Sequence, residues 1–231
     1  TKMKTKKDIK ITNFDDFASK YDDYISTSIQ SIDNNLSYYH DCKAKITKRE
    51  INFNPNNILD FGCGVGILTK YLIDYFPDSQ MYAYDNSEES LKYLKEKLPK
   101  VICLNNLNTD KKFDLIFLSN VIHHVTNSER EDLFKKIYSL LNEKGQLIIF
   151  EHNPLNPVTL KIVAKCEFDK DAELIKKRNL VNICLNNKLK VINSGYIHFF
   201  PSKLKLFFGL EKYLKWLFLG AQYFCIFEKE N

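Results

Sequence analysis

The stretch Ile58-Leu59-Asp60-Phe61-Gly62-Cys63-Gly64-Val65-Gly66 decides the fold of this chain. An apolar run ends in an acidic residue and is followed by three alternate glycines. Glycine lets a backbone turn tightly and approach a ligand without Cβ clashes. A helix that begins near Gly66 would also point its free N–H groups at that ligand. The stretch therefore predicts a strand, a glycine turn and a helix around a nucleotide-like ligand, the alternative being a coincidental turn between a core strand and a helix.

The glycine spacing argues against a nicotinamide cofactor. In the dinucleotide fingerprint G-x-G-x-x-G a third glycine closes the motif, but Thr69 stands at that place here. A nicotinamide-dependent oxidoreductase is the disfavoured rival interpretation, and binding of NAD would support it.

A second acidic residue, Asp85, ends the next apolar run, Gln80 to Tyr84. A carboxylate about 20 residues past the glycines accepts hydrogen bonds from ribose hydroxyls in α/β nucleotide-binding folds. Asp85, Asn86 and Ser87 could instead cap the following helix, since all three residue types serve as N-caps. After a strand, glycine turn and helix, the ribose role is the favoured one.

From Asn57 onward, short apolar runs alternate with amphipathic segments, which predicts a parallel sheet with helices on both faces. We expect strands near 57–61, 80–84, 101–104, 113–118 and 146–151, and helices near 66–75, 88–98 and 129–142. The fold class is therefore α/β and doubly wound, with its ligand at the carboxyl ends of the strands. Upstream, apolar residues from Phe14 to about Arg49 recur at helical spacing. We expect residues 1–52 to form an N-terminal helical cap and residues 53–231 the ligand-binding core.

The composition limits the classes of partner that this chain is expected to bind. The chain has 34 Lys and Arg against 29 Asp and Glu, a net charge of +5 that is spread along the sequence and does not indicate nucleic-acid binding. Its six cysteines form no C-x-x-C pair and no zinc spacing, so we expect reduced thiols, no metal site and a cytoplasmic protein. We find no apolar stretch long enough to cross a membrane.

Four runs of the sequence resemble one family. Residues 58–66 resemble motif I of class I S-adenosylmethionine-dependent methyltransferases, and Phe113 to Val125 resembles the fourth-strand motif of the small-molecule members. Lys144 to Glu151 is similar to the turn and fifth strand that follow, and Phe17-Ala18-Ser19-Lys20-Tyr21-Asp22 resembles the F-A-x-x-Y-D helix of the same group. The likeness covers nearly the whole chain.

The resemblance implies a Rossmann-like, mostly parallel seven-stranded sheet whose last strand is antiparallel. It also implies S-adenosylmethionine as the cofactor, with Asp60 near the methionine amino group and Asp85 at the ribose. Where many members place an acidic residue at the adenine amine, this sequence has Asn105-Asn106-Leu107, and an asparagine carbonyl can accept that hydrogen bond. The predicted cofactor-binding residues are Tyr21, Asp60, Gly62, Cys63, Gly64, Gly66, Asp85, Asn86, Asn106, Leu107 and Asn120.

Catalysis requires alignment of a nucleophile with the electrophilic methyl group and, for a hydroxyl, removal of its proton. His123 and His124 follow the fourth strand, and imidazole suits a general base near neutral pH. The alternative is that one histidine is structural and the other only lines the pocket. Glu151, His152 and Asn153 end the fifth strand at the same edge and are candidates for substrate contact or for the base.

The acceptor is expected to be a small molecule. Ser119-Asn120-Val121-Ile122 stands where amino-methylating DNA enzymes carry an N-P-P-Y type of motif, and there is no Pro-Cys nucleophile, which argues against nucleic acid. Residues 151–169, 199–201 and 220–223 are similar to a bacterial subgroup associated with sugar, surface-polysaccharide or natural-product pathways, so we expect a hydroxyl acceptor of that kind. Carbon or nitrogen methylation, or a regulatory protein that binds the cofactor without turnover, are the alternatives, and the oligomeric state stays open.

Ser202 to Leu219 mixes lysines with large apolar residues. Basic amphipathic helices of this kind contact membrane surfaces or lipid-linked molecules. The favoured interpretation is a helix that packs on the sheet, turns its lysines to solvent, and connects to an apolar strand over residues 221–228.

Overall fold

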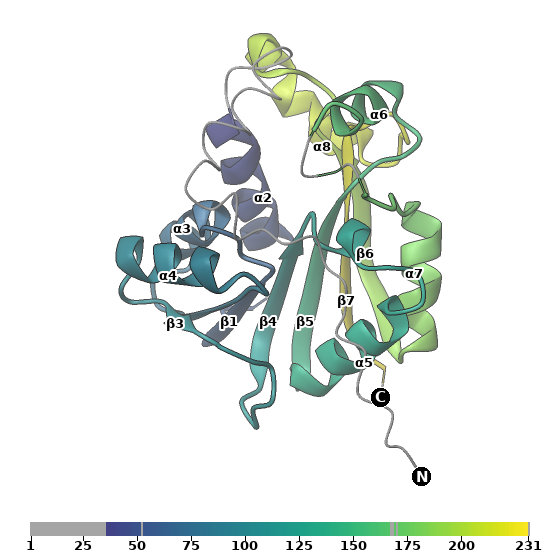
Figure 1. The fold of residues 1–231 in the computed structure, drawn as a ribbon. Coiled ribbons are helices and arrows are strands. Elements are labelled where there is room, and N and C mark those ends of the chain that lie inside the picture. Colours follow the sequence, from purple (N-terminus) through teal and green to yellow (C-terminus); the bar gives the residue numbers. More distant parts are fainter. Residues whose placement is uncertain (1–35, 52, 167–168, 170, 231) are drawn as a thin grey trace.

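The computed structural model describes residues 36–51, 53–166, 169 and 171–230. Its centre is a seven-stranded sheet in the order β3-β2-β1-β4-β5-β7-β6 (Figure 1). The strands are β1 (Asn57–Phe61), β2 (Gln80–Tyr84), β3 (Ile102–Cys103), β4 (Phe113–Ser119), β5 (Leu141–His152), β6 (Leu189–Ile197) and β7 (Gln222–Lys229). Strands β1 to β5 run parallel, and β7 lies antiparallel between β5 and β6. The predicted Rossmann-like α/β fold is confirmed, including its antiparallel last strand.

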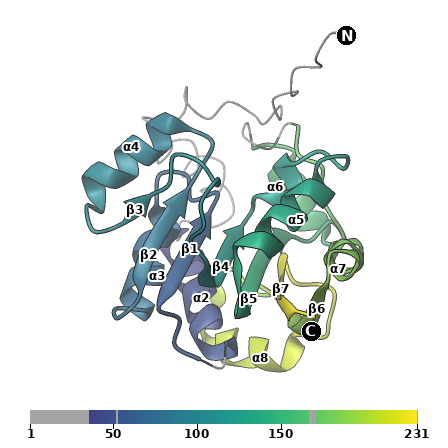
Figure 2. The ribbon, with the colours of Figure 1, turned by 90° about the horizontal axis from the view of Figure 1, so that it is seen from below.

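Helices cover both faces of the sheet (Figure 2). They are α2 (Leu36–Glu50), α3 (Ile67–Tyr75), α4 (Glu88–Lys97), α5 (Arg130–Leu140), α6 (Pro157–Val163), α7 (Lys177–Asn186) and α8 (Glu211–Leu214), with the 3₁₀ helices η2 (Ile122–His124) and η4 (Ser202–Leu210). One apolar cluster joins the sheet to α5 and α7, and a second joins its other face to α2, α3 and Leu94 of α4. The central strand β4 is apolar along most of its length because it is buried on both faces.

The order of the strands fixes the place of the site. The chain winds outward from β1 to β2 and β3, then returns to place β4 on the other side of β1. Ligands in open α/β sheets bind at this reversal, outside the carboxyl ends of the strands. Asp60, Ser119 and His152 stand at the carboxyl ends of β1, β4 and β5.

The N-terminal part is described in part. The predicted helical region from Phe14 to Arg49 is helical over α2, which packs on α3. Tyr21 lies outside the described residues, so its role and the boundary at residue 52 stay predictions.

Two elements differ from the sequence-based expectation. Strand β5 begins at Leu141 rather than near Gln146, because Leu141 pairs with Phe113 ahead of an irregularity in the β4–β5 register. The predicted helix over 202–219 is instead η4 followed by the single turn α8, interrupted at Leu204 by non-helical dihedral angles. The expectation that its apolar residues pack on the sheet is wrong, since Leu206 is 91% and Trp216 77% exposed. No described helix is both long and apolar enough to span a membrane.

Candidate functional site

The turn between β1 and α3 depends on its glycines. Gly62, Gly64 and Gly66 have φ angles of +75°, +53° and +83°, which residues with a Cβ atom rarely adopt. A Cβ atom on Gly62 would also lie 2.4 Å from Val121 Cγ2, just after β4. The turn therefore packs closely against Val121, the second residue after β4.

Asp60 lies buried beneath this turn. Its Oδ2 accepts a 2.6 Å hydrogen bond from the Thr69 hydroxyl. Burial, with a smaller contribution from Asp85, raises the pKa of Asp60 to about 7. A carboxylate in this position is stabilised by a cation, and the ammonium group of an amino-acid-like ligand would supply one.

Asp85 follows β2 and ties two loops together. Its Oδ2 accepts from Gly64 N–H at 2.8 Å and its Oδ1 from Ser87 N–H at 2.9 Å. The N-cap of α4 is Ser87, whose side chain accepts from Ser90 N–H, so the capping alternative holds for Ser87 and not for Asp85. The carboxylate lines the cavity instead.

One cavity of about 410 Å³ lies at the carboxyl ends of β1, β2, β4 and β5. It brings together most of the residues predicted from sequence, namely Asp60, Gly62, Cys63, Gly64, Asp85, Asn86, Leu107, Asn120, His123, His124 and His152. Burial raises the pKa of the Cys63 thiol well above its usual value, so this residue contributes a neutral wall.

Four predicted residues do not line this cavity. Gly66 packs against Leu94, and the Asn106 side chain accepts from Asn108 N–H. Glu151 is buried behind the cavity wall. Asn153 donates to the carbonyls of Phe218 and Gly220, each at 2.8 Å, which joins β5 to the segment before β7.

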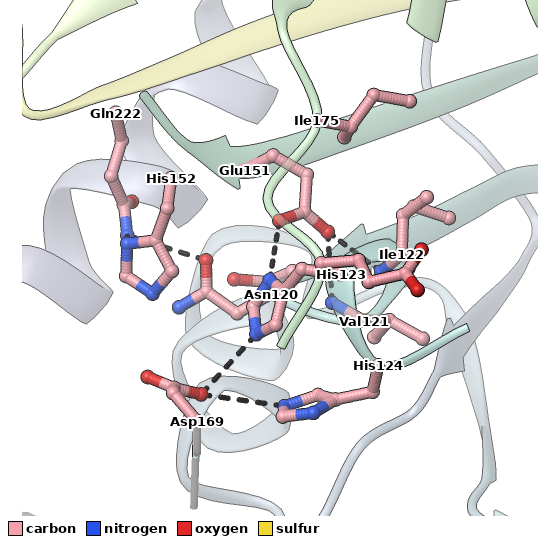
Figure 3. Close-up of polar contacts among 12 residues, drawn as sticks. Asn120, Val121, Ile122, His123, His124, Glu151, His152, Asp169, Ile175 and Gln222 are labelled. Atoms are coloured by element: carbon pink, nitrogen blue, oxygen red, sulfur yellow. Dashed lines mark hydrogen bonds and ion pairs between the residues drawn. The ribbon is translucent and has the colours of Figure 1, made fainter. Parts of the chain in front are cut away.

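Glu151 connects β5 to η2 (Figure 3). One carboxylate oxygen accepts from the backbone N–H groups of Val121 and Ile122 at 3.0 and 2.7 Å, and the other contacts His123 Nδ1 at 2.6 Å. Burial alone would raise the pKa of Glu151, but His123 lowers it to about 2. The residue predicted as a substrate contact is thus engaged in holding His123.

His123 and His124 differ in their environments. His123 is fully buried, and although burial lowers its pKa, Glu151 and Asp169 raise it to about 9. His124 is 12% exposed, and burial followed by repulsion from His123 lowers its pKa to about 4. At neutral pH His123 therefore carries a proton and His124 is a neutral imidazole.

His152 lies beside this pair, at the end of β5. Burial and the neighbouring His123 lower its pKa to about 4. Its Nδ1 is 3.3 Å from Gln222 Nε2, which is also 3.3 Å from Asn120 Oδ1 (Figure 3). Asn120 itself has a φ of +58° and donates its backbone N–H to Phe150.

Sequence analysis missed several residues of the cavity, chiefly His40, Lys43 and Asp169. Lys43 is buried and donates to the Ser119 hydroxyl at 2.8 Å. Burial lowers its pKa to about 8, against the opposing effect of Glu151. The spacing of His40 and Lys43, one helical turn apart on α2, is the signal that could have found them. Asp169 lies in the segment after α6, and no pattern in the sequence marks it.

The comparisons with known proteins agree with this geometry. The methyltransferase domain family matches residues 58–145. A malonyl-[acyl-carrier protein] O-methyltransferase from Ilyobacter polytropus is 31% identical over 142 residues, which are 58% of this chain and 48% of that protein. An uncharacterized methyltransferase from Bacillus mycoides is 27% identical over 140 residues, 58% of this chain and 63% of that protein. The chain thus matches between about half and less than two thirds of the length of these curated relatives.

Solved structures share the fold. A TehB-like S-adenosylmethionine-dependent methyltransferase from Corynebacterium glutamicum has a TM-score of 0.63 at 17% identity, covering 93% of this chain and 99% of its own. An S-adenosylmethionine-dependent methyltransferase from Thermotoga maritima has a TM-score of 0.67 at 17% identity, covering 94% and 98%. Residues 58–145 thus match the methyltransferase domain family, and the chain shares its fold with S-adenosylmethionine-dependent methyltransferases.

Proposed function

We propose that this chain transfers a methyl group from S-adenosylmethionine to a hydroxyl oxygen of a small molecule, with a sugar, a surface-polysaccharide precursor or a natural product as the acceptor class. The observation that carries the proposal is a single cavity lined both by the glycine turn and Asp85 and by the histidines after β4 and β5. Cofactor and acceptor can therefore meet without leaving the cavity.

The described residues fit the cofactor. The glycine turn keeps open the space that Cβ atoms would fill, and Asp60 offers a buried carboxylate for an ammonium group. We assign Lys43 to the cofactor carboxylate and Asp85 to the ribose hydroxyls, because both residues line the cavity. Leu107 supplies an apolar surface for adenine, while contacts from Asn106 and Tyr21 stay predictions.

The bound cofactor supplies an electrophilic methyl group, so the chain has to orient the acceptor and take its proton. We assign the general base to His124, the partly exposed histidine of the pair. Its Nε2 lies 3.5 Å from Asp169 Oδ1, and this carboxylate would stabilise the imidazolium that forms. His123, fully buried against Glu151, is a positioning residue.

The relative from Ilyobacter polytropus supports an oxygen acceptor, because its name assigns O-methylation to that protein. Its acyl-carrier substrate belongs to that longer protein. The sugar and natural-product classes rest on the resemblance of residues 151–169, 199–201 and 220–223 to their bacterial subgroup.

The test is turnover of purified protein with S-adenosylmethionine and a panel of nucleotide sugars, glycans, phenols and carboxylates, followed by release of S-adenosylhomocysteine and by product mass. We expect His124→Gln to lower kcat by about 100-fold or more, the usual contribution of a general base, with cofactor affinity unchanged. Turnover that survives this substitution would favour carbon or nitrogen methylation. Cofactor binding without turnover on any acceptor would favour the regulatory alternative.

A further inference from the structure

Three potential metal-ligand side chains meet in the cavity, from three separate segments. His123 comes from η2 after β4, His152 from the end of β5, and Asp169 from the segment after α6. One nitrogen or oxygen atom from each lies within 4.8 Å of the other two, and all three residues line the cavity (Figure 3).

The ring of His123 is held in the orientation that a metal ligand requires. Its Nδ1 is fixed by Glu151 at 2.6 Å, which turns Nε2 toward Asp169. Among the described residues this buried Nε2 has no hydrogen-bond partner, and its ion-pair distance to Asp169 Oδ1 is 3.4 Å. A carboxylate that binds one imidazole nitrogen while the other faces a ligand is the usual support of a metal-bound histidine.

Gln222 offers similar support to His152. Its amide lies 3.3 Å from His152 Nδ1, so the ring presents Nε2 to the cluster. The Oε1 of Gln222 is buried without a partner among the described residues. Turning over the amides of Gln222 and Asn120 together would bring this oxygen to Nδ1 as an acceptor and keep a hydrogen bond between the two amides, since the orientation of an amide is assigned from its hydrogen bonds. That arrangement leaves the lone pair of Nε2 directed at the cluster.

We propose that His123 Nε2, His152 Nε2 and the Asp169 carboxylate bind a divalent first-row transition-metal ion of the Fe²⁺ to Zn²⁺ series. Two imidazoles and one carboxylate are a donor set for these ions rather than for Mg²⁺ or Ca²⁺. Ligands about 2.0–2.2 Å from one ion lie about 3–3.5 Å apart, so the 3.4 Å between His123 and Asp169 already fits. Small rotations of His152 and Asp169 close the remaining distances.

The charges around the cluster suit a divalent ion. Asp169 and the supporting Glu151 bring two carboxylates to the cluster. The opposing cations are Lys43 on α2, whose ammonium group donates to Ser119, and His123, which releases its Nε2 proton when the ion binds. Three protein ligands leave coordination positions open toward the cavity. That an acceptor oxygen occupies such a position rests on the proposed function, whereas the ion site itself does not.

The experiment is a titration of chelator-treated, purified protein with Co²⁺, followed by the visible d–d absorption of the bound ion. Zn²⁺ is then added as a competitor. We expect one equivalent of Co²⁺ to bind, Zn²⁺ to displace it, and Mg²⁺ to have no effect. Asp169→Asn and His152→Gln should each weaken Co²⁺ binding at least tenfold. His40→Gln, which changes a cavity histidine outside the three ligands, should leave it unchanged.

Binding that none of the ligand substitutions weakens, or no absorption band at millimolar Co²⁺, would overturn the proposal. A thiolate-to-cobalt charge-transfer band would place the ion on cysteines and would also overturn it. Substitution of the buried His123 by Gln can prevent folding. Asp169 lies in a loop segment, so Asp169→Asn tests the site in a folded protein. S-adenosylmethionine affinity measured on the same samples reports separately on the proposed function.

Discussion

At the scale of single residues, burial controls how Asp60 behaves. Its pKa of about 7 in the fold lies above the ordinary value of 3.8. The folded chain therefore holds this proton between those two pH values while the unfolded chain has lost it, so the free energy of unfolding falls as pH rises through this window.

Asp60→Asn removes this dependence and provides the test. We expect the stability of the natural protein relative to the variant to fall by at most about 1.4 kcal/mol per pH unit between pH 5 and 7, measured by urea denaturation without cofactor. A difference that is constant with pH would show that Asp60 does not titrate in this window.

For Lys43 we predict that one substitution changes cofactor affinity without lowering stability. Lys43→Met replaces a buried charged side chain with an apolar one of similar volume. The free energy of unfolding should therefore stay within about 1 kcal/mol of its value in the natural protein, or rise. Affinity for S-adenosylmethionine should fall about tenfold or more, because the cofactor carboxylate loses a charge-assisted hydrogen bond. Calorimetric titration and denaturation of the same preparation check both. An unchanged affinity would remove Lys43 from the cofactor site.

The residues predicted correctly to line the cavity share one property, which is their place at the end of an apolar run. Asp60, Asp85 and His123 could be found because parallel strands bring such positions to one edge. Asp169 could not, since it reaches the cavity from a segment without a local motif, and the only signal for Lys43 is its spacing from His40 on α2. The proposed metal site could not be predicted for the same reason: its ligands are far apart in sequence and follow no ligand spacing.

At the scale of elements, Glu151 connects the end of β5 to η2 and thereby sets the position of both histidines. Glu151→Gln keeps one oxygen for the backbone N–H groups but places an amide N–H group against His123 Nδ1. We expect a loss of about 1–3 kcal/mol of stability, as for a buried hydrogen-bonding group left unsatisfied, and a fall in kcat that exceeds the change in cofactor affinity.

Urea denaturation and the split between kcat and KM measure this effect. Glu96→Gln, an exposed change on α4, is the matched control. Unaltered stability and kcat in Glu151→Gln would contradict the positioning role.

The strands were predictable nearly to the residue where they are short and buried, as in β1 and β2. The segment over 202–219 was not, because its apolar composition fits a buried helix whereas η4 and α8 leave those side chains exposed. Composition indicates what a segment could bury. Only the tertiary structure decides whether a surface is there to bury it against.

At the scale of the whole molecule, this exposed segment supports the membrane-surface contact expected as the alternative from sequence. Leu206, Tyr213 and Trp216 are exposed together with Lys203 and Lys212. Exposed apolar side chains among lysines bind anionic interfaces through burial and charge attraction.

Trp216 is the single tryptophan of the chain, so its fluorescence reports directly on this contact. We expect a blue shift and co-sedimentation with anionic vesicles, both weakened by salt. Leu206→Ser should reduce binding several-fold, and Ile102→Ser, an exposed apolar residue on β3, should not. Unshifted fluorescence at low salt would exclude the contact.

Alternation and the glycine turn predicted a doubly wound parallel sheet, and the resemblance implied its seven strands and antiparallel last strand. Neither identified the acceptor. Its identity depends on side chains from α2, η2, β5 and the segment after α6, which the fold brings together without a shared pattern.

The most direct test of the central claim is calorimetric titration with S-adenosylmethionine and S-adenosylhomocysteine, with NAD as the competing ligand. Asp85→Ala is the variant, and Glu88→Gln, an exposed carboxylate on the adjacent helix, is its control. We predict that both S-adenosyl ligands bind the natural protein and the control, and that Asp85→Ala weakens binding at least tenfold. Absence of binding by either ligand, or tighter binding of NAD, would contradict the assignment of this cavity to S-adenosylmethionine.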